Sequence, residues 1–255
     1  MSDMHLRFAI APDVHPDYLP GWHIFLRYIQ KQLQVGMNIA TFDNFTQLRL
    51  ALEQDALDLV FASAADCSYL VQKKHFQVVA QPENDVTEVT VLCRADSPWQ
   101  VMDDVENEYH AIACVDSPEV RQLGLILLEC ADVDVVHLDI QAAQNHLQAV
   151  KYLMNGTVDL AFVPTDVYES WSATLRKSLR PLVQTMRDDV DALSHVLLLC
   201  SSHQHLLEPL KHLLQDLNGN TYQGILQDIN IRKWRILNDN SDIDFLIDLV
   251  DTLQI

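Results

Sequence analysis

The pentapeptide LDLVF at residues 57–61 has a similar counterpart, VDLAF, at residues 158–162. In each copy an acidic residue stands directly before an apolar run, and a polar turn that carries a tyrosine follows. The match extends upstream without gaps, because Gln47 aligns with Gln148 at the same distance from the pentapeptide. The chain therefore contains two similar halves.

Both halves alternate short apolar runs with amphipathic stretches of helical period. In the first half we expect strands at 6–11, 38–41 and 57–62, with helices at 21–33 and 45–54. In the second half we expect strands at 111–115, 135–138 and 158–163, with helices at 120–130 and 142–155. This order is typical of a parallel sheet with right-handed crossovers. Further strands at 88–94 and 195–200 are interpreted as crossings between two lobes, and helices at 208–217 and 243–253 complete the chain.

Composition narrows the class of partner. Seventeen basic residues stand against 36 acidic ones, a net charge of −19, which disfavours binding to nucleic acid or to an anionic membrane surface. No run of 18 apolar residues occurs, so we expect a protein that is not embedded in a membrane. We also expect it to be a monomer. The first ten residues lack the features of a secretory signal, which predicts a cytoplasmic location for the sequence as it stands, or a periplasmic one if a leader was removed.

The five cysteines are widely spaced and form no CxxC motif, so we expect them to be reduced, buried and structural, which favours the cytoplasm. His203 and His205 lie two residues apart, but no further ligand completes a metal set, and neither a metal nor a cofactor is expected. The motifs GxSxG, HExxH, GxGxxG and the P-loop do not occur. The sequence therefore gives no positive sign of catalysis.

Two half-repeats, two crossings and a helical tail resemble the type II periplasmic-binding-protein fold. The residues resemble more narrowly the phosphate/phosphite/phosphonate-binding family of ABC-transporter substrate-binding proteins, in which a helix followed by Val-Asp-Leu-Ala closes each half, as at 153–161 here. The resemblance implies an α/β fold of two Rossmann-like lobes joined by two hinge crossovers. Residues 1–88 plus 201–255 would form one lobe and residues 89–200 the other, with hinge strands at the two ends of the second lobe.

The same resemblance implies that a small polar or anionic solute, phosphate-like or phosphonate-like, is bound in the cleft between the lobes. The protein would deliver this solute to an ABC transporter permease. One alternative is a cytoplasmic enzyme of the same fold, similar to the chorismate-dehydratase type or to the pyrimidine-synthase type of thiamine biosynthesis. Another is the sensing domain of a transcription regulator, although no helix-turn-helix precedes residue 6.

Ligands of open α/β sheets lie beyond the carboxyl ends of the strands, which selects the loops after the predicted strands. The first loop, at 12–22, is rich in proline and aromatic residues, and the later loops carry hydroxyl and charged side chains. The predicted ligand-binding residues are Asp13, Tyr18, Ser63, Ser117, Arg121, Thr165, Asp166 and Tyr168.

Several of these residues have a structural alternative. Ser63 and Thr165 are also good candidates for helix caps, and Arg121 is also expected as a solvated helix residue. His195, at the second crossing, is interpreted as structural rather than catalytic.

The turn at residues 116–119 reads Asp-Ser-Pro-Glu, where the family resemblance implies a Ser/Thr-rich turn at a helix start. Only Ser117 fits the expected hydroxyl role. Pro118 removes one backbone donor, and Glu119 adds a negative charge at the helix end that would otherwise attract an anion. We therefore expect weak binding of simple phosphate.

Overall fold

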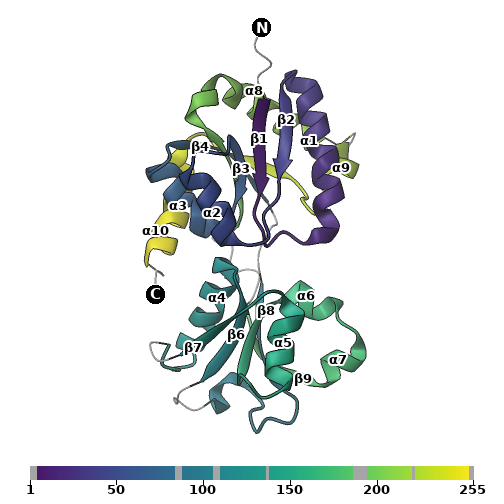
Figure 1. Cartoon of the computed structure of the whole chain (residues 1–255), viewed down its shortest axis with the longest axis vertical. Coiled ribbons are helices and arrows are strands. Elements are labelled where there is room, and N and C mark those ends of the chain that lie inside the picture. Colours follow the sequence, from purple (N-terminus) through teal and green to yellow (C-terminus); the bar gives the residue numbers. More distant parts are fainter. Residues whose placement is uncertain are drawn as a thin grey trace. The chain divides into compact units, whose positions relative to one another are not determined.

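The computed structural model describes residues 5–83, 88–105, 110–135, 138–185, 194–219 and 222–252. The chain divides into two compact units (Figure 1). Residues 1–85 together with 192–255 form the first unit, and residues 86–191 form the second. Each unit is built around its own sheet, with helices on both faces.

The first unit contains a six-stranded sheet in the order β11-β4-β10-β3-β1-β2. Its strands are β1 (His5–Ile10), β2 (Gly36–Ala40), β3 (Leu59–Ala62), β4 (Phe76–Pro82), β10 (Val196–Cys200) and β11 (Trp234–Ile236). β1 is parallel to β2 and β3, whereas β10 is antiparallel to β3 and β4, and β11 is antiparallel to β4. The carboxyl ends of β1 to β4 therefore share one edge of the sheet, and β10 and β11 begin at that edge.

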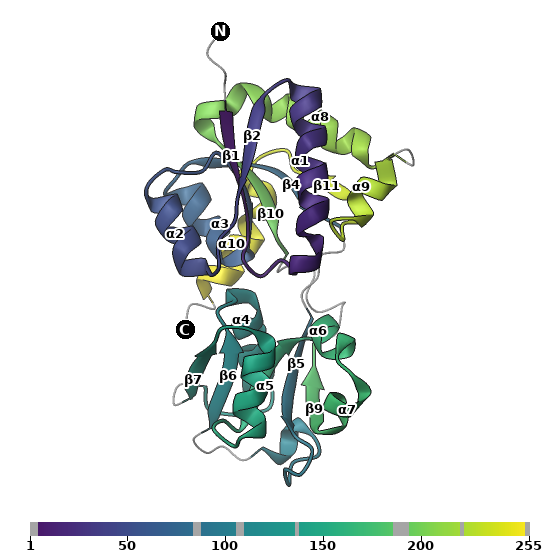
Figure 2. The same ribbon diagram turned by 45° about the vertical axis from the view of Figure 1, so that its right-hand side comes forward.

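Helices cover both faces of this sheet. They are α1 (Leu19–Leu33), α2 (Phe45–Glu53), α3 (Ala64–Gln72), α8 (Leu207–Leu217), α9 (Gln223–Gln227) and α10 (Asp244–Thr252), with short 3-10 turns at Pro16–Tyr18, Ser201–Leu206 and Asn240–Ile243. Figure 2 shows α1, α8 and α9 on one side and α2, α3 and α10 on the other. An aromatic cluster of Trp22, Phe25, Phe61 and Trp234 fills the core under α1, with ring centroids 4.7–6.0 Å apart. Such packing of large rings contributes much of a core's stability.

The second unit contains a five-stranded sheet in the order β7-β6-β8-β5-β9. Its elements are β5 (Val89–Arg94), a 3-10 turn (Met102–Asp104), β6 (Ala111–Val115), α4 (Pro118–Glu129), β7 (Asp139–Ala143), α5 (His146–Met154), β8 (Leu160–Pro164), α6 (Thr165–Ser170), α7 (Ala173–Lys177) and β9 (Leu179–Gln184). β6 is parallel to β7 and β8, and β5 is antiparallel to β8 and β9. The carboxyl ends of β6 to β9 therefore share one edge, as in the first unit.

The repeated aspartate makes the same contacts in both units. In the first, the backbone N–H of Arg7 donates to Asp58 Oδ2 at 2.8 Å, and the N–H of Asp58 donates to the Arg7 carbonyl at 2.9 Å. In the second, the N–H of Ala111 donates to Asp159 Oδ2 at 3.0 Å, and the N–H of Asp159 donates to the Ala111 carbonyl at 2.8 Å. Each aspartate thus joins the amino ends of two neighbouring parallel strands.

The repeated glutamine also has one role in both units. Asn44 and Asn145 cap α2 and α5, and their side chains accept hydrogen bonds from the backbone N–H of Gln47 and Gln148 at 3.0 and 2.9 Å. The side chain of each glutamine accepts a hydrogen bond from the residue before the cap. This reciprocal capping box starts the helix that leads to the repeated aspartate. The alignment of the two halves therefore reflects shared geometry.

Two boundaries differ from those expected. β10 hydrogen-bonds to β3 and β4, so it belongs to the first unit and not to the lobe predicted over residues 89–200. Its apolar residues Val196 to Leu199 are all buried, as a central strand of a sheet with helices on both faces requires. In the second half, β7 begins at Asp139 and α5 at His146, later than the predicted 135 and 142; residues 136–137 of the predicted strand lie outside the described residues.

Three strands were not predicted: β4, β9 and β11. β9 carries Pro181 and lies at the edge of its sheet, where a missing N–H is tolerated. β11 has only three residues, and its place depends on pairing with β4 rather than on a sequence pattern of its own.

The backbone at Asp228 approaches Gly21 of α1 so closely that a larger residue would not fit there. A Cβ on Gly21 would lie 2.0 Å from the carbonyl oxygen of Asp228, whereas a Cβ on Gly224 of α9 would meet nothing within 4 Å. We predict that Gly21→Ala lowers the free energy of unfolding by about 1–3 kcal/mol through overpacking. The matched change Gly224→Ala should leave it unchanged or raise it by up to about 1 kcal/mol, because alanine favours a helix. Urea unfolding of both variants measures the difference, and equal effects would contradict the close approach.

Candidate functional site

The carboxyl edges of the two sheets hold most of the predicted ligand-binding residues. In the first unit, Asp13 and Tyr18 lie after β1, and Ser63 lies after β3. In the second, Ser117 and Arg121 lie after β6, and Thr165 begins the helix after β8. Because such edges are the usual ligand sites of open α/β sheets, each edge is a candidate ligand site of its own unit.

Asp13 contacts His195, a residue that the sequence analysis interpreted as structural. His195 Nε2 lies 3.0 Å from Asp13 Oδ1, and the imidazole ring stacks on Phe61 with centroids 4.9 Å apart. Both side chains are largely buried, at 8% exposure for His195 and 16% for Asp13. The contact ties the loop after β1 to the start of β10, so His195 positions that loop.

Ser63 is a helix cap. Its hydroxyl accepts a hydrogen bond from the backbone N–H of Asp66 at 3.3 Å and lies 3.1 Å from Asp66 Oδ2. Arg49 Nε donates to the other carboxylate oxygen of Asp66 at 2.7 Å. The N-terminus of α3 is therefore occupied by side chains of this chain, and the ligand role of Ser63 stays a prediction.

Tyr18 ends the 3-10 turn after Asp13 and is partly buried against the core cluster of the first unit. Its ring meets the ring of His15 edge-on, with centroids 5.9 Å apart. His15 Nδ1 in turn accepts a hydrogen bond from the N–H of Asp17 at 3.3 Å. The loop is thus an ordered turn, as its proline and aromatic content predicts.

A second group of polar residues at this edge was missed by the sequence. Gln81, at the end of β4, donates its amide N–H to the hydroxyl of Ser194, and its amide oxygen accepts a hydrogen bond from Arg235 Nη2. Gln81 and Ser194 are buried, whereas Arg235 is exposed. The pairing of β4 with both β10 and β11 brings these residues together, so no local sequence pattern predicts them.

In the second unit, the start of α4 differs from an open anion site. Ser117 is the N-cap and is buried, but its side chain makes no capping hydrogen bond. Pro118 occupies the first helical position, and Glu119 in the first turn is only 1% exposed. Arg121 is exposed, in agreement with the alternative that it is a solvated helix residue. A buried carboxylate in the first turn opposes an incoming anion.

The other candidates of the second unit lie at the start of α6. The hydroxyl of Thr165 is buried and lies 2.9 Å from the hydroxyl of Thr90, which also accepts a hydrogen bond from Gln184 Nε2 at 3.0 Å. Asp166 is exposed and accepts a hydrogen bond from the next backbone N–H at 2.8 Å. Tyr168 packs edge-on against Trp171. Thr165 is thus part of a polar cluster that the sequence did not predict.

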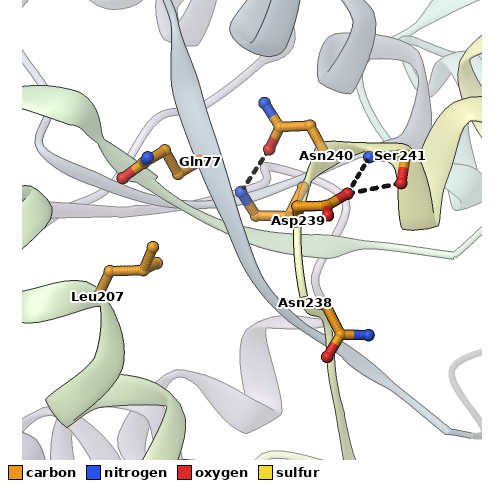
Figure 3. Close-up of a pocket in the computed structure, with 7 residues that line it drawn as sticks. Gln77, Leu207, Asn238, Asp239, Asn240 and Ser241 are labelled. Atoms are coloured by element: carbon orange, nitrogen blue, oxygen red, sulfur yellow. Dashed lines mark hydrogen bonds between the residues drawn. The ribbon is translucent and has the colours of Figure 1, made fainter.

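Other parts of the molecule offer weaker sites. Within the described ranges, no three histidine, cysteine, aspartate or glutamate side chains are placed to hold a metal ion, and His203 lies instead 3.3 Å from Asp58. None of the helices in those ranges is long and apolar enough to cross a bilayer. A hollow of about 350 Å³ opens beside the first strand residues of β4, at the opposite edge from Asp13 (Figure 3). There Asp239 already accepts hydrogen bonds from Ser241, so the hollow offers little free chemistry.

The fold is similar to that of solved binding proteins. PhnD1 of Prochlorococcus marinus, solved in complex with methylphosphonate, has 14% identity and a TM-score of 0.78, with 99% of each chain covered. A binding protein component of an ABC phosphonate transporter from Pseudomonas aeruginosa has 13% identity and a TM-score of 0.69, over 98% of this chain and 88% of the other. The alkanesulfonate-binding protein SsuA of Xanthomonas axonopodis pv. citri, bound to MOPS, has 14% identity and a TM-score of 0.69, over 98% and 93%.

No curated protein matches the sequence of this chain. The family model described as "ABC transporter, phosphonate, periplasmic substrate-binding protein" matches residues 8–242, which span both sheets and both carboxyl edges. The two-lobed α/β fold expected from the repeat is confirmed by the solved structures. The chain belongs to the family of phosphonate-type periplasmic substrate-binding proteins of ABC transporters.

Proposed function

We propose that this chain binds a small polar or anionic solute and presents it to the permease of an ABC transporter. The observation that carries the proposal is the family match over residues 8–242, joined with polar side chains at the carboxyl edge of each sheet. The family is one of transport proteins, which favours binding over the enzyme alternative.

The residues at the N-termini of α3 and α4 indicate which class of solute the protein binds. Ser63 caps the start of α3, and Asp66 lies in its first turn. The first turn of α4 carries the buried Glu119. A helix N-terminus attracts anions through free N–H groups and the positive end of its dipole, and a carboxylate placed there cancels part of that attraction. We infer that a doubly charged phosphate binds weakly here and that neutral or singly charged solutes bind better.

Thermal-shift and calorimetric titrations test the proposal. Suitable probes are inorganic phosphate, methylphosphonate, ethanesulfonate, acetate and arginine, because similar folds have been solved with methylphosphonate, MOPS and arginine bound. A solute that binds the native state raises the apparent unfolding midpoint. At least one probe other than phosphate should do so. If none of them shifts the midpoint or gives a heat of binding, solute binding of this class is contradicted.

Glu119 provides a direct test of the anion argument. We predict that Glu119→Ser, and the isosteric Glu119→Gln, raise the affinity for inorganic phosphate by about fivefold, because removing one repulsive charge at a helix N-terminus is worth about 1 kcal/mol. Glu129→Ser is the matched control, since it removes the same charge from the other, exposed end of α4. Phosphate affinity that is submicromolar in the unaltered protein, or unchanged in both Glu119 variants, would contradict the argument.

We further propose that the chain works in the periplasm with its permease, as its family does. None of the five cysteines forms a disulfide, which by itself favours a reducing compartment. However, Cys67, Cys93 and Cys114 are buried, and burial raises the pKa of Cys114 to about 12 and raises the pKa of the Cys93 thiol. A protonated, buried thiol reacts slowly with oxidants, so free cysteines are compatible with an oxidising compartment.

Thiol labelling checks this account. At pH 8 the native protein should label rapidly at the exposed Cys130 and more slowly at the half-buried Cys200, while the three buried thiols stay unmodified. All five should label after unfolding in denaturant, because each is free. Mass spectrometry counts the labels. Rapid native labelling of Cys114, or fewer than four labels after unfolding, would contradict it.

A further inference from the structure

A short basic segment stands out in this acidic chain. Residues 232–235 read Arg-Lys-Trp-Arg, in a chain whose net charge is −19. Arg235 pairs in register with Gln81 near the carboxyl end of β4. The segment therefore delivers positive charge to the carboxyl edge of the first sheet, the edge that also holds Asp13 and Ser63.

The side chain of Arg235 is anchored at this edge. Its Nη2 donates to the amide oxygen of Gln81, and the amide nitrogen of Gln81 donates to the hydroxyl of Ser194. Because Gln81 and Ser194 are 4% and 5% exposed, the amide is held inside the unit while the guanidinium remains exposed. An arginine held by one of its five N–H groups keeps the others available in a fixed fork.

Several other cations of the first unit lie beside carboxylates. Arg49 lies 2.7 Å from Asp66, Lys74 lies 2.8 Å from Asp55, and Arg7 contacts Asp58. Among the residues that the structure describes, Arg235 contacts a neutral amide and has no carboxylate within salt-bridge distance. Its charge is thus available at the edge where Ser63 already caps the start of α3.

We propose that Arg235 is the residue of the first unit that binds an anionic group of the solute, and that this group is a singly charged oxyanion such as a carboxylate or sulfonate. The inference rests on the proposed solute-binding function. A guanidinium fork binds such a group through two parallel hydrogen bonds, and it does not need a free helix N-terminus. Gln81 acts as the positioning residue that orients the fork.

Calorimetric titration with acetate, ethanesulfonate and methylphosphonate tests the assignment. Arg235→Gln should weaken binding of the anion that the unaltered protein prefers by about tenfold or more, because a bidentate charged contact is lost. Lys233→Gln is the matched control: it removes a positive charge from the exposed residue just before β11, two positions away in the chain, and should change affinity by less than about threefold, as screened surface charges do. Arg235→Lys keeps the charge without the fork and should fall between them.

Gln81→Met leaves the guanidinium in place but removes its anchor. It should weaken anion binding less than Arg235→Gln does, and adding it to Arg235→Gln should cause little further loss, because both act through one contact. Thermal unfolding of each variant confirms that it is folded. Additive losses in the double variant would overturn the positioning role of Gln81.

The outcomes separate the assignment from the proposed function. If an anion binds the unaltered protein and Arg235→Gln binds it equally well, the assignment is wrong and solute binding stands. The same holds if only arginine, which carries a carboxylate, binds and Arg235→Gln does not weaken that binding. If none of the probes binds, the proposed function and this assignment fail together.

Discussion

Two aspartates hold the central strands of this protein in register. Asp58 hydrogen-bonds to both the N–H and the carbonyl of Arg7, and Asp159 does the same with Ala111. These contacts place Phe8 beside Leu59 and Ile112 beside Leu160, all of them buried. A slip of one residue would turn every side chain of a strand to the opposite face, so register decides which residues form the core. It also decides where the strands end, and thus which loops form the carboxyl edges.

The two edges use their polar residues in different ways. In the first unit, Asp13 is bound by His195 and Ser63 caps α3, so the positive charge available there comes from Arg235. In the second unit, the hydroxyl of Thr165 is joined to that of Thr90, and the start of α4 carries Glu119. Helix N-termini can bind anions, but in this protein the first turns of α3 and α4 carry the acidic side chains Asp66 and Glu119. In our proposal, recognition rests on side chains rather than on backbone N–H groups, so specificity should be sensitive to single substitutions.

The sequence predicted more of the fold than of the site. The strands ending near Ala62 and Pro164 follow from the hydrophobic period, which acts over a few residues. The alignment of Gln47 with Gln148 was visible in the sequence, but their role in helix capping was found only in the structure. β10 was placed in the wrong lobe, because a run of buried apolar residues suits a central strand of either sheet. Similarly, the sequence named Asp13 and His195 separately but did not predict their contact, because the two residues lie 182 positions apart.

The sequence by itself determined the repeat, the two sheets with helices on both faces and the altered turn at residues 116–119, because each depends on residues close together in the chain. Tertiary structure alone decided that Ser63 is a cap, that His195 supports the first loop, and that Arg235 reaches the carboxyl edge through Gln81. The physical reason is that side-chain hydrogen bonds form between strands brought together by sheet pairing. The pairing partners of β10 and β11 depend on the packing of the whole unit, not on the residues of those strands.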